Sequence, residues 1–349
     1  MADPIAMALQ TAGNSLRVSW YSGINWLMNR QARNLSPAPK YTPTKPVPDR
    51  SELFEDLRAL MRRDAEAVGA GLYPPEITDE PRIWDHFQRL RAMYADLPGT
   101  TERRQSRETS TATVAGKTAD LPDYFTQDFH YQTGGYLTDE SARLYDLQVE
   151  TLFYGAAAAM RRACLRPIAE FMYGRDQRRV SCLDVACGTG RLLREIRRAY
   201  PAMTLTGLDL SGPYLEEARQ HMGRLRPATL IEANAEQIPC ADASQDIVTC
   251  AFLFHELPPE VRRTVTREIA RVLKPGGLFV FLDSLQMGDK PGWDGLLEAF
   301  PVRFHEPYYR SYAIDDLNTL FTGAGLEPTA HELAFLAKVV TCRKANGNQ

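Results

Sequence analysis

The chain has 349 residues, of which 44% are apolar, so it is long enough to bury a large core together with an extension or a second domain. Its formal net charge of −3 at pH 7 provides no overall basic field for a polyanion, so we expect no nucleic-acid partner. The six cysteines are scattered, without a CxxC pair or a His/Cys cluster, which predicts free thiols in a reducing compartment and no metal site.

The first fifty residues predict a helix that is both basic and aromatic. Leu16, Trp20, Ile24 and Leu27 recur at helical spacing and form one apolar stripe, which ends at the proline-rich residues 36–48. The segment carries six Lys or Arg against two Asp. Two interpretations stay open: an interfacial helix that contacts a membrane or caps a lipophilic pocket, and a helix that packs on the body of the protein or on a second copy of the chain.

Two more amphipathic helices are expected over residues 53–61 and 83–94, where apolar side chains recur at helical spacing. Ser51 and Thr78 stand where the N-caps of these helices would be. We expect the two helices to pack on each other as a hairpin, within a helical N-terminal extension that covers residues 1–99.

A change of composition separates this extension from the rest of the chain. Residues 100–120 are rich in Thr, Ser and Arg and contain almost no large apolar residue, which predicts a flexible linker. From residue 121 to 349, short β-branched runs alternate with helix-like stretches, the pattern of an α/β domain with a parallel sheet. The expected strands are Val180–Val185, Thr204–Leu208, Thr229–Glu232, Asp246–Phe252 and Leu278–Asp283, followed by a hairpin of Glu327–Ala334 and Ala337–Cys342.

The most informative segment is the loop after the first of these strands. Asp184 and Val185 lead through small residues to Gly190 and a helical stretch, and such a loop lets a ligand approach the backbone and the helix N-terminus closely. The dinucleotide fingerprint GxGxxG would place its third glycine at position 193, where this chain has Leu193. An NAD-dependent enzyme is therefore only a distant alternative.

Further polar and glycine-rich segments follow at the ends of the later strands. Asp209 comes nineteen residues after Gly190, and its carboxylate can accept both hydroxyl groups of a ribose. Asn234 can accept a hydrogen bond from an adenine amino group, while the backbone of Ala235 donates one. The end of a later helix turns into the fifth strand through the residues RVLKPGG at 271–277.

In order and spacing, these segments resemble the UbiE-like branch of the class I S-adenosylmethionine-dependent methyltransferases, over roughly residues 145–343. The matching segments read LDVACGTG, GLDLS, ANAEQIP and RVLKPGG. The sequence departs from the family at Asn234, where Asp is usual, and at Cys240, which replaces an aromatic or apolar residue. The resemblance implies a Rossmann-like, seven-stranded, mostly parallel sheet with a terminal antiparallel hairpin, and S-adenosyl-L-methionine as the cofactor across the C-terminal ends of the first strands.

The resemblance also implies which residues bind the cofactor. Asp184 would orient the loop or meet the methionine amine through water, the backbone around Ala186 and Gly188 would contact the methionine part, and Asp209 would hold the ribose. The predicted set is Asp184, Ala186, Cys187, Gly188, Thr189, Gly190, Asp209, Leu210, Asn234, Ala235, Glu236 and Phe252.

Methyl transfer is an in-line displacement at a sulfonium carbon, so the enzyme mostly supplies alignment, exclusion of water and, where needed, a base. The loop after the fourth strand faces the methyl group in this architecture, and His255 and Glu256 are therefore the predicted catalytic residues. In relatives the first His of a similar run can be purely structural, so that role stays open for His255.

Two aromatic segments are expected to close the acceptor pocket. One belongs to a lid at the start of the domain, residues 121–160, and the other follows the fifth strand. Aromatic walls suit a lipophilic or ring-bearing acceptor and can stabilise a sulfonium, although the same side chains could simply pack the lid on the core. The predicted substrate and lid residues are Tyr131, Tyr136, Tyr145, His305, Tyr308 and Tyr309.

The sequence thus predicts a methyltransferase for a small, lipophilic or aromatic acceptor. The alternative is a non-catalytic S-adenosylmethionine-binding protein that docks on a partner through its N-terminal helices. Contact of these helices with a membrane surface or with a second copy of the chain stays open. The N-terminus lacks the pattern of a secretory leader, so the expected location is the cytoplasm, with peripheral membrane association as a second option.

Overall fold

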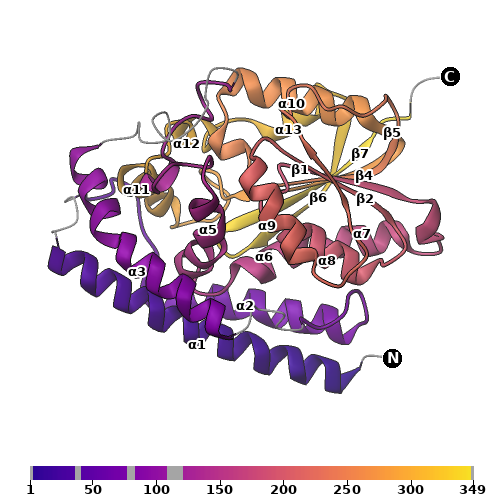
Figure 1. Ribbon diagram of the computed structural model, residues 1–349. Helices are drawn as coiled ribbons and strands as arrows, with labels where there is room; N and C mark the ends of the chain where they lie inside the picture. Colours follow the sequence, from indigo (N-terminus) through magenta and orange to yellow (C-terminus); the bar gives the residue numbers. More distant parts are fainter. Residues whose placement is uncertain (1–2, 36–40, 77–82, 108–120, 347–349) are drawn as a thin grey trace.

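A seven-stranded sheet lies at the centre of the C-terminal domain in the computed structural model, which describes residues 3–35, 41–76, 83–107 and 121–346. Its strand order is β3-β2-β1-β4-β5-β7-β6, and helices flank it on both sides (Figure 1). The strands are β1 (Ser181–Val185), β2 (Thr204–Asp209), β3 (Thr229–Glu232), β4 (Gln245–Ala251), β5 (Leu273–Ser284), β6 (Leu326–Ala334) and β7 (Ala337–Lys344).

The pairing of the strands confirms the predicted fold class. Strands β1 to β5 pair in parallel, whereas β7 is antiparallel to both β5 and β6. β1 pairs with β2 on one side and with β4 on the other, so the winding of the sheet reverses at β1. Ligands of open α/β sheets bind at such a reversal, beyond the C-terminal ends of the strands.

Strand β5 differs most from its prediction, because it begins at Leu273 rather than at Leu278. Leu273 pairs with Gln245 of β4 before a shift of register, so the glycine turn is part of the strand and does not precede it. A Cβ on Gly277 would lie 2.7 Å from the carbonyl oxygen of Lys274, which explains why glycine is needed there. The other strands end within two residues of their expected positions.

Helices cover both faces of the sheet. Along β5, Val280 and Leu282 join one core cluster, while Phe279 and Phe281 join the other, as expected for side chains that alternate between the faces of a strand. The helices are α5 (Asp139–Leu152), α6 (Ala157–Ala163), α7 (Leu165–Met172), α8 (Arg191–Ala199), α9 (Gly212–Met222), α10 (Pro259–Val272), α11 (Asp294–Arg303), α12 (Tyr309–Tyr312) and α13 (Leu317–Thr322), with short 3₁₀ turns η1 (Phe129–Tyr131), η2 (Gln177–Arg179) and η3 (Phe254–Glu256).

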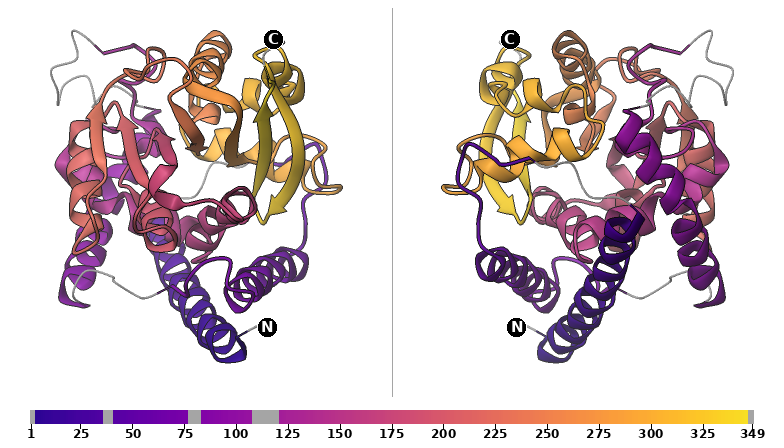
Figure 2. Two further views of the ribbon diagram at one scale, coloured as in Figure 1. Left: turned by 90° about the vertical axis from the view of Figure 1, so that its right-hand side faces the viewer. Right: turned by 90° about the vertical axis from the view of Figure 1, so that its left-hand side faces the viewer.

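Three N-terminal helices, α1 (Pro4–Leu35), α2 (Arg50–Gly69) and α3 (Ile83–Ser106), form the extension. α1 lies between α2 and α3 along one side of the molecule and contacts both, as well as α5 (Figures 1 and 2). The predicted hairpin of α2 with α3 is therefore wrong, because each of them packs on α1 instead. Across the described ranges, none of the helices has the length and hydropathy needed to cross a membrane.

Two local predictions in the extension also need correction. The N-cap of α2 is Asp49 rather than Ser51, because Asp49 forms a reciprocal capping box with Glu52. Helix α3 continues to Ser106, so the first part of the predicted linker is helical. Thr78 and the rest of the linker, residues 108–120, lie outside the described residues.

The side of α1 that faces the protein is not the predicted apolar stripe. Leu16, Trp20 and Leu27 are 73%, 44% and 53% exposed, and only Ile24 of that stripe is buried. Ile24 packs with Tyr21 in a small apolar cluster against α3 and α5. The helix therefore packs on the body of the protein while it leaves several large apolar side chains at the surface.

A buried ionic cluster fixes the extension to the domain. The fully buried guanidinium of Arg162 on α6 donates two hydrogen bonds of 2.8 Å to Asp64 on α2 and one of 2.7 Å to Glu76. Gln10 and Asn14 of α1 donate to the same Asp64 carboxylate at 2.7 and 2.9 Å. Burial alone would raise the pKa of Asp64, but the charge of Arg162 and these hydrogen bonds hold it below its usual value. A charge buried this deeply is tolerated only because it is paired.

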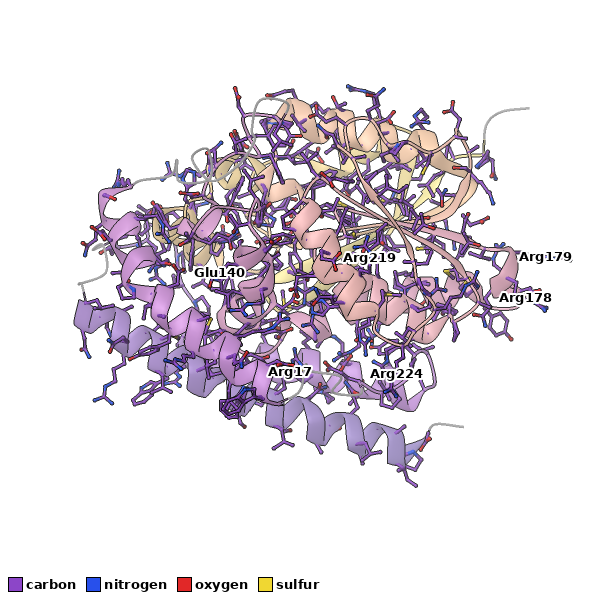
Figure 3. The ribbon with its side chains drawn as sticks, viewed as in Figure 1. Arg17, Glu140, Arg178, Arg179, Arg219 and Arg224 are labelled. Carbon is purple, nitrogen blue, oxygen red and sulfur yellow. The ribbon has the colours of Figure 1, made fainter. Side chains whose placement is uncertain are left out.

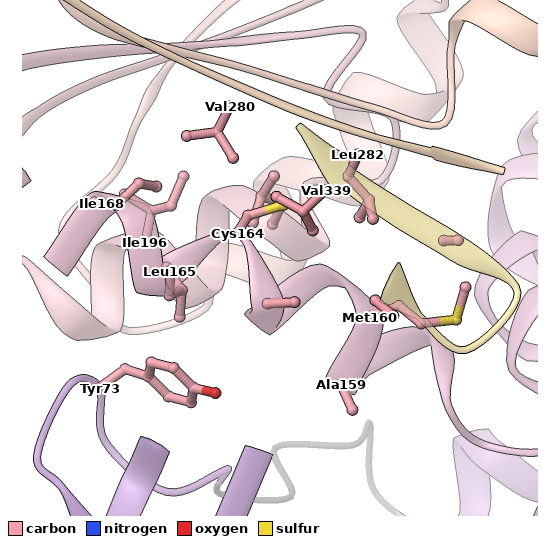
Figure 4. Packing of buried hydrophobic residues seen from close by; sticks show 14 of the residues in the cluster. Tyr73, Ala159, Met160, Cys164, Leu165, Ile168, Ile196, Val280, Leu282 and Val339 are labelled. Atoms are coloured by element: carbon pink, nitrogen blue, oxygen red, sulfur yellow. The ribbon is translucent and has the colours of Figure 1, made fainter. Parts of the chain in front are cut away.

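Other contacts extend this attachment along α1. Arg17, labelled in Figure 3, forms salt bridges with Glu76 at 3.1 Å and with Glu150 of α5 at 2.8 Å. Figure 4 shows Tyr73, which follows α2, on one side of α6 and α7, with Val280 of the sheet on the other. The extension and the α/β domain therefore share one core.

Candidate active site

The loop after β1 bends through three residues with positive φ. Ala186, Gly188 and Gly190 have φ values of 55°, 54° and 73°, and α8 begins directly afterwards at Arg191. A Cβ on Gly190 would lie 2.8 Å from the Cβ of Ala218 on α9, so only glycine fits there. A Cβ on Gly188 would meet no atom within 4 Å, because Gly188 faces an open pocket, the first cavity. The loop therefore leaves room for a ligand against its own backbone.

Asp209 joins the end of β2 to this loop. Its carboxylate accepts the backbone N–H of Gly188 at 2.7 Å and that of Ser211 at 2.9 Å. Burial raises the pKa of Asp209, and these N–H groups partly counteract the increase. The side chain lines the first cavity, where its remaining lone pairs can accept the two hydroxyl groups of a ribose.

The residues after β3 close the far end of the first cavity. Asn234 and Ala235 line it, and Asn234 Oδ1 accepts the backbone N–H of Glu236 at 2.8 Å. The Glu236 carboxylate accepts hydrogen bonds from Tyr124 at 2.8 Å and from the Asn234 amide at 3.1 Å. Asn234 keeps a second lone pair on Oδ1, which can accept from an adenine amino group.

The predicted lid is tied to the glycine loop through Asp146. Its carboxylate accepts the hydroxyl of Thr189 at 2.8 Å and Nε of Arg191 at 2.7 Å. Burial alone would raise the pKa of Asp146, but Arg191 and His221 hold it below its usual value. The neighbouring Tyr145 lines the first cavity, so the pair both anchors the lid and covers the site.

The first cavity is a partly open pocket between the lid and the C-terminal ends of β1, β2 and β4. Among the residues that the structure describes, no Lys or Arg is part of its lining, which suits a ligand without phosphates. The predicted cofactor residues in the lining are Ala186, Gly188, Asp209, Leu210, Asn234, Ala235 and Phe252. The predicted cofactor residues outside the lining are Asp184, Cys187, Thr189, Gly190 and Glu236.

Asp184 has a supporting position among these outer residues. It is buried beneath the loop and accepts the hydroxyl of Thr249 on β4 at 2.6 Å. Burial raises its pKa to about 7. Its contacts fit the role of orienting the loop, one of the two roles that the sequence left open.

A second cavity adjoins the first and shares Tyr145, Phe252 and Glu256 with it. Most of its other lining residues are apolar and come from α2, from α5 and α11 with the residues that follow them, and from the β6–β7 turn: Leu53, Val149, Leu152, Phe153, Leu296, Leu297, Ala299, Phe300, Phe304 and Leu336. Its polar lining residues include His130, Ser284 and Arg303. Because the two cavities meet at Glu256, the predicted catalytic pair lies between the first cavity and the largely apolar second one.

His255 is held at this junction by a buried carboxylate. Its Nδ1 lies 2.6 Å from Oδ1 of the fully buried Asp283, and its Nε2 lies 3.7 Å from the Glu256 carboxylate. Burial would lower the pKa of His255, but the charge of Asp283 and this hydrogen bond raise it to about 10. The imidazole is therefore protonated at neutral pH and presents a positive charge to the second cavity.

Glu256 has the opposite electrostatic situation. Burial raises the pKa of Glu256 to about 7, while His255 and the hydroxyl of Tyr136, which donates at 2.5 Å, limit the increase. A carboxylate with such a pKa can take up and release a proton near neutral pH. His255 and Glu256 thus combine a fixed positive charge with a group that can act as a base.

Two further titratable residues near this pair were not among the predicted site residues. His130 Nε2 lies 3.1 Å from Oε1 of Glu306, and burial lowers the pKa of His130 to about 3 while it raises that of Glu306. They come from segments far apart in sequence, so no motif joins them. Among the described residues, no group of three His, Cys, Asp or Glu side chains is placed to hold a metal ion.

The predicted lid residues fall into two groups. Tyr136 and Tyr145 line the first cavity, and Tyr145 and Tyr309 line the second. The remaining three, Tyr131, His305 and Tyr308, lie outside both linings. His305 and Tyr308 form hydrogen bonds with the same Gln127 side chain, so they hold the lid closed rather than face a ligand.

Among the lining residues of the first cavity that the sequence analysis missed are Phe125, Ser211 and Tyr214. Tyr214 makes edge contacts with Tyr136 and Tyr145 at 5.4 and 5.2 Å between ring centroids. Ser211 belongs to the quoted GLDLS segment and could have been found there. Phe125 and Tyr214 have no such motif signal.

Comparison with known proteins identifies the chain. A family model described as "Methyltransferase domain" matches residues 182–277. Over 172 residues the chain is 34% identical to the demethylmenaquinone methyltransferase of Thermotoga maritima. The aligned region covers 49% of this chain and 70% of that relative. The chain is a class I S-adenosylmethionine-dependent methyltransferase of the UbiE type. Its cofactor is therefore S-adenosyl-L-methionine, as the sequence predicted.

Two more similarities place this UbiE-type methyltransferase among its relatives. It is 34% identical over 154 residues to the ubiquinone/menaquinone biosynthesis C-methyltransferase UbiE of Syntrophotalea carbinolica. This aligned region covers 43% of this chain and 60% of that relative. The crystal structure of human N-acetylserotonin methyltransferase in complex with SAM is similar in fold, with a TM-score of 0.51, 15% identity, and coverage of 74% of this chain and 70% of that one. This structural likeness supports the fold alone.

Proposed function

We propose that this methyltransferase acts on a lipophilic, ring-bearing acceptor of the quinol type that binds in the second cavity. The observation that carries the proposal is the junction of the two cavities at Glu256, with largely apolar walls on the acceptor side. The names of the relatives support it, because they are methyltransferases of quinone biosynthesis. An apolar cavity with a few convergent polar groups is the usual form of a site for such a molecule.

S-Adenosylmethionine supplies a methyl group on a positively charged sulfur. The residues of this chain have to align the acceptor with that group and exclude water. Phe252 and Tyr145 stand in both cavities and form the passage between them. Aromatic faces at this point favour a cationic group and hold an acceptor ring in place.

Glu256 and His255 handle the proton in this proposal. Glu256 accepts the proton of an acceptor hydroxyl group, and the protonated His255 stabilises the negative charge that is left on the ring. The acceptor atom then forms a bond with the methyl carbon, the carbon–sulfur bond breaks, and its electron pair stays on sulfur. Asp283 holds His255 in its charged form throughout.

The test uses the full chain with methyl-labelled S-adenosylmethionine and a set of reduced naphthoquinols and benzoquinols. We expect label to enter the ring compounds, with product identified by mass spectrometry. Binding of S-adenosylhomocysteine without transfer to any of these ring acceptors would overturn the proposal of a quinol-type acceptor.

We also propose that the outer faces of α1 and α3 contact a membrane surface. Trp26 and Trp84 are 54% and 69% exposed, and Arg30 lies over the Trp26 ring at 5.5 Å. Exposed Phe87 and Tyr94 follow on α3. Aromatic side chains beside arginines suit the interface of an anionic bilayer, from which a lipophilic acceptor would be taken.

A further inference from the structure

A third cavity lies between α1, α3 and α5, on the outer side of the second cavity. It shares five lining residues with the second cavity: His130, Tyr145, Val149, Leu152 and Phe304. Its other lining residues come mostly from α1 and α3; they include the apolar Met28, Ala32, Met93 and Leu97 and polar residues such as Asn29 and Arg104. The extension therefore supplies the outer walls of a space that continues from the acceptor site.

A surface groove between α1 and α3 continues this series to the outside of the molecule. The groove shares Met28 with the third cavity, and its apolar walls are formed by residues such as Leu27, Phe87 and Leu90. In Figures 1 and 2, α1 and α3 run side by side along the edge of the molecule. The cavities thus form a row that starts at the surface and ends beside Glu256.

Several polar side chains of the third cavity are already hydrogen-bonded within the protein. In the third cavity, the Asn25 amide donates to the carbonyl of Thr151 at 3.0 Å, and Asp96 accepts hydrogen bonds from Thr133 and Thr100 at 2.7 and 2.9 Å. Arg104 lies over the ring of Phe304 at 5.5 Å. A ligand in this cavity meets methionine, leucine, valine and phenylalanine side chains together with polar groups, several of which are hydrogen-bonded within the protein.

We propose that this row of cavities binds a hydrocarbon chain carried by the acceptor, with the ring in the second cavity and the chain between α1 and α3. The inference rests on the proposed function for the ring, and it assigns a substrate-binding role to the N-terminal extension. Each methylene buried in such a passage strengthens binding by roughly fourfold, so a chain of several carbons would dominate the affinity.

The test places a bulky side chain in the passage. Ala32 is a half-buried residue of α1 that lines the third cavity, and Ala32→Trp would obstruct it. Leu97→Trp obstructs the same cavity from α3. Ala12→Trp is the matched control, because Ala12 is exposed on the same helix and lines none of the cavities described. Thermal unfolding checks that each variant is folded.

Two readouts separate this inference from the proposed function. The first is the KM for a hydroquinone with and without a decyl chain. The second needs no turnover: calorimetric titration of the protein, saturated with S-adenosylhomocysteine, with the fully methylated quinone with and without the same chain. We expect the wild type and Ala12→Trp to prefer the chain-bearing compound by about tenfold or more in both assays. Ala32→Trp and Leu97→Trp should lose that preference. Their KM and dissociation constants for the compound without the chain should stay unchanged.

Equal binding of the two quinones by the wild type would overturn the passage, and so would an unchanged preference in both tryptophan variants. Absence of methyl transfer with retained binding of the decyl compound would instead contradict the proposed function and leave the passage standing.

Discussion

His255 Nδ1 lies 2.6 Å from Oδ1 of Asp283, whose side chain is fully buried near the end of β5. The same carboxylate also accepts the backbone N–H of Phe254 at 2.8 Å. The Asp283 carboxylate therefore holds the loop that carries His255 on β5, and it also stabilises the protonated form of the His255 ring. This relationship gives His255 a fixed position and a defined protonation state.

Replacement of Asp283 by Asn should remove that charge. Because burial alone lowers the pKa of His255, the value of about 10 should fall to its ordinary range or below in Asp283→Asn. A hydrogen bond to a charged group contributes about 1.5–3 kcal/mol, so we expect kcat/KM at pH 7 to fall roughly tenfold to a hundredfold. NMR titration of the His255 ring measures the pKa, and an unchanged value would contradict the assignment.

Glu256 should determine the pH dependence of the reaction on its acid side. Its pKa of about 7 means that the base form becomes populated as the pH rises through 7, so kcat/KM should increase up to that point and then level off. Glu256→Gln should lower the rate by about 10²–10⁴-fold and abolish this rise. Glu260→Gln, on the exposed side of α10, is the control and should keep the wild-type profile.

The sequence predicted the sheet well because each buried strand is a local run of apolar residues, as in Leu183 and Val248, whose side chains face one core cluster. It failed for α1 because the buried side of that helix carries Gln10 and Asn14, and hydrophobic periodicity cannot detect a polar face. That face becomes intelligible only with Asp64, fifty residues further along the chain.

The candidate site likewise contains residues that could be predicted from the sequence and residues that could not. Gly188 and Asp209 lie in motifs with fixed spacing, so their place in the first cavity was accessible from the sequence. Glu306 and His130 are brought together by the insertion after β5 and the lid, and nothing in their local sequence marks the pairing. The roles of individual residues toward the cofactor stay predictions.

Asp209 offers a direct test of those roles. Its carboxylate lines the first cavity and is the one expected to accept the ribose hydroxyl groups. Asp209→Asn should weaken binding of S-adenosylhomocysteine by roughly tenfold to a hundredfold, the loss of hydrogen bonds to a charged acceptor. Calorimetric titration gives the dissociation constant. Glu216→Gln on the exposed side of α9 should bind as the wild type does, and equal binding by both variants would refute the role of Asp209.

Membrane contact through α1 predicts binding to vesicles that contain anionic lipid. The wild type should sediment with such vesicles, and the bound fraction should fall with added salt because arginines contribute to the attraction. Trp26→Asp should reduce binding several-fold, since it removes an inserted ring and adds a repulsive charge. Tyr173→Asp changes an even more exposed aromatic residue, directly after α7, and should bind normally. Equal sedimentation of both variants would argue for another role of the α1 surface.

The pairing of Asp64 with Arg162 should dominate the stability of the extension. Asp64→Ala leaves the guanidinium of Arg162 buried without its main partner and should lower the free energy of unfolding by about 3–5 kcal/mol. Glu66 lies two residues further along α2 and its side chain is exposed, so Glu66→Ala should lower the free energy of unfolding by less than about 1 kcal/mol. Urea unfolding at pH 7 measures both.

The same cluster gives the stability a pH dependence whose sign follows from the two carboxylates. The pKa of Asp64 is lowered and that of Glu76 is lowered to about 2, because Arg162 stabilises their charged forms in the folded protein. Their contribution is therefore complete above the unfolded-state values near 4 and is lost as the pH falls from there toward 2. Asp64→Asn removes one of the two groups, so unfolding experiments between pH 5 and 2 should show a shallower loss of stability than in the wild type. Parallel curves for the two proteins would mean that Asp64 does not keep its charge in the folded state.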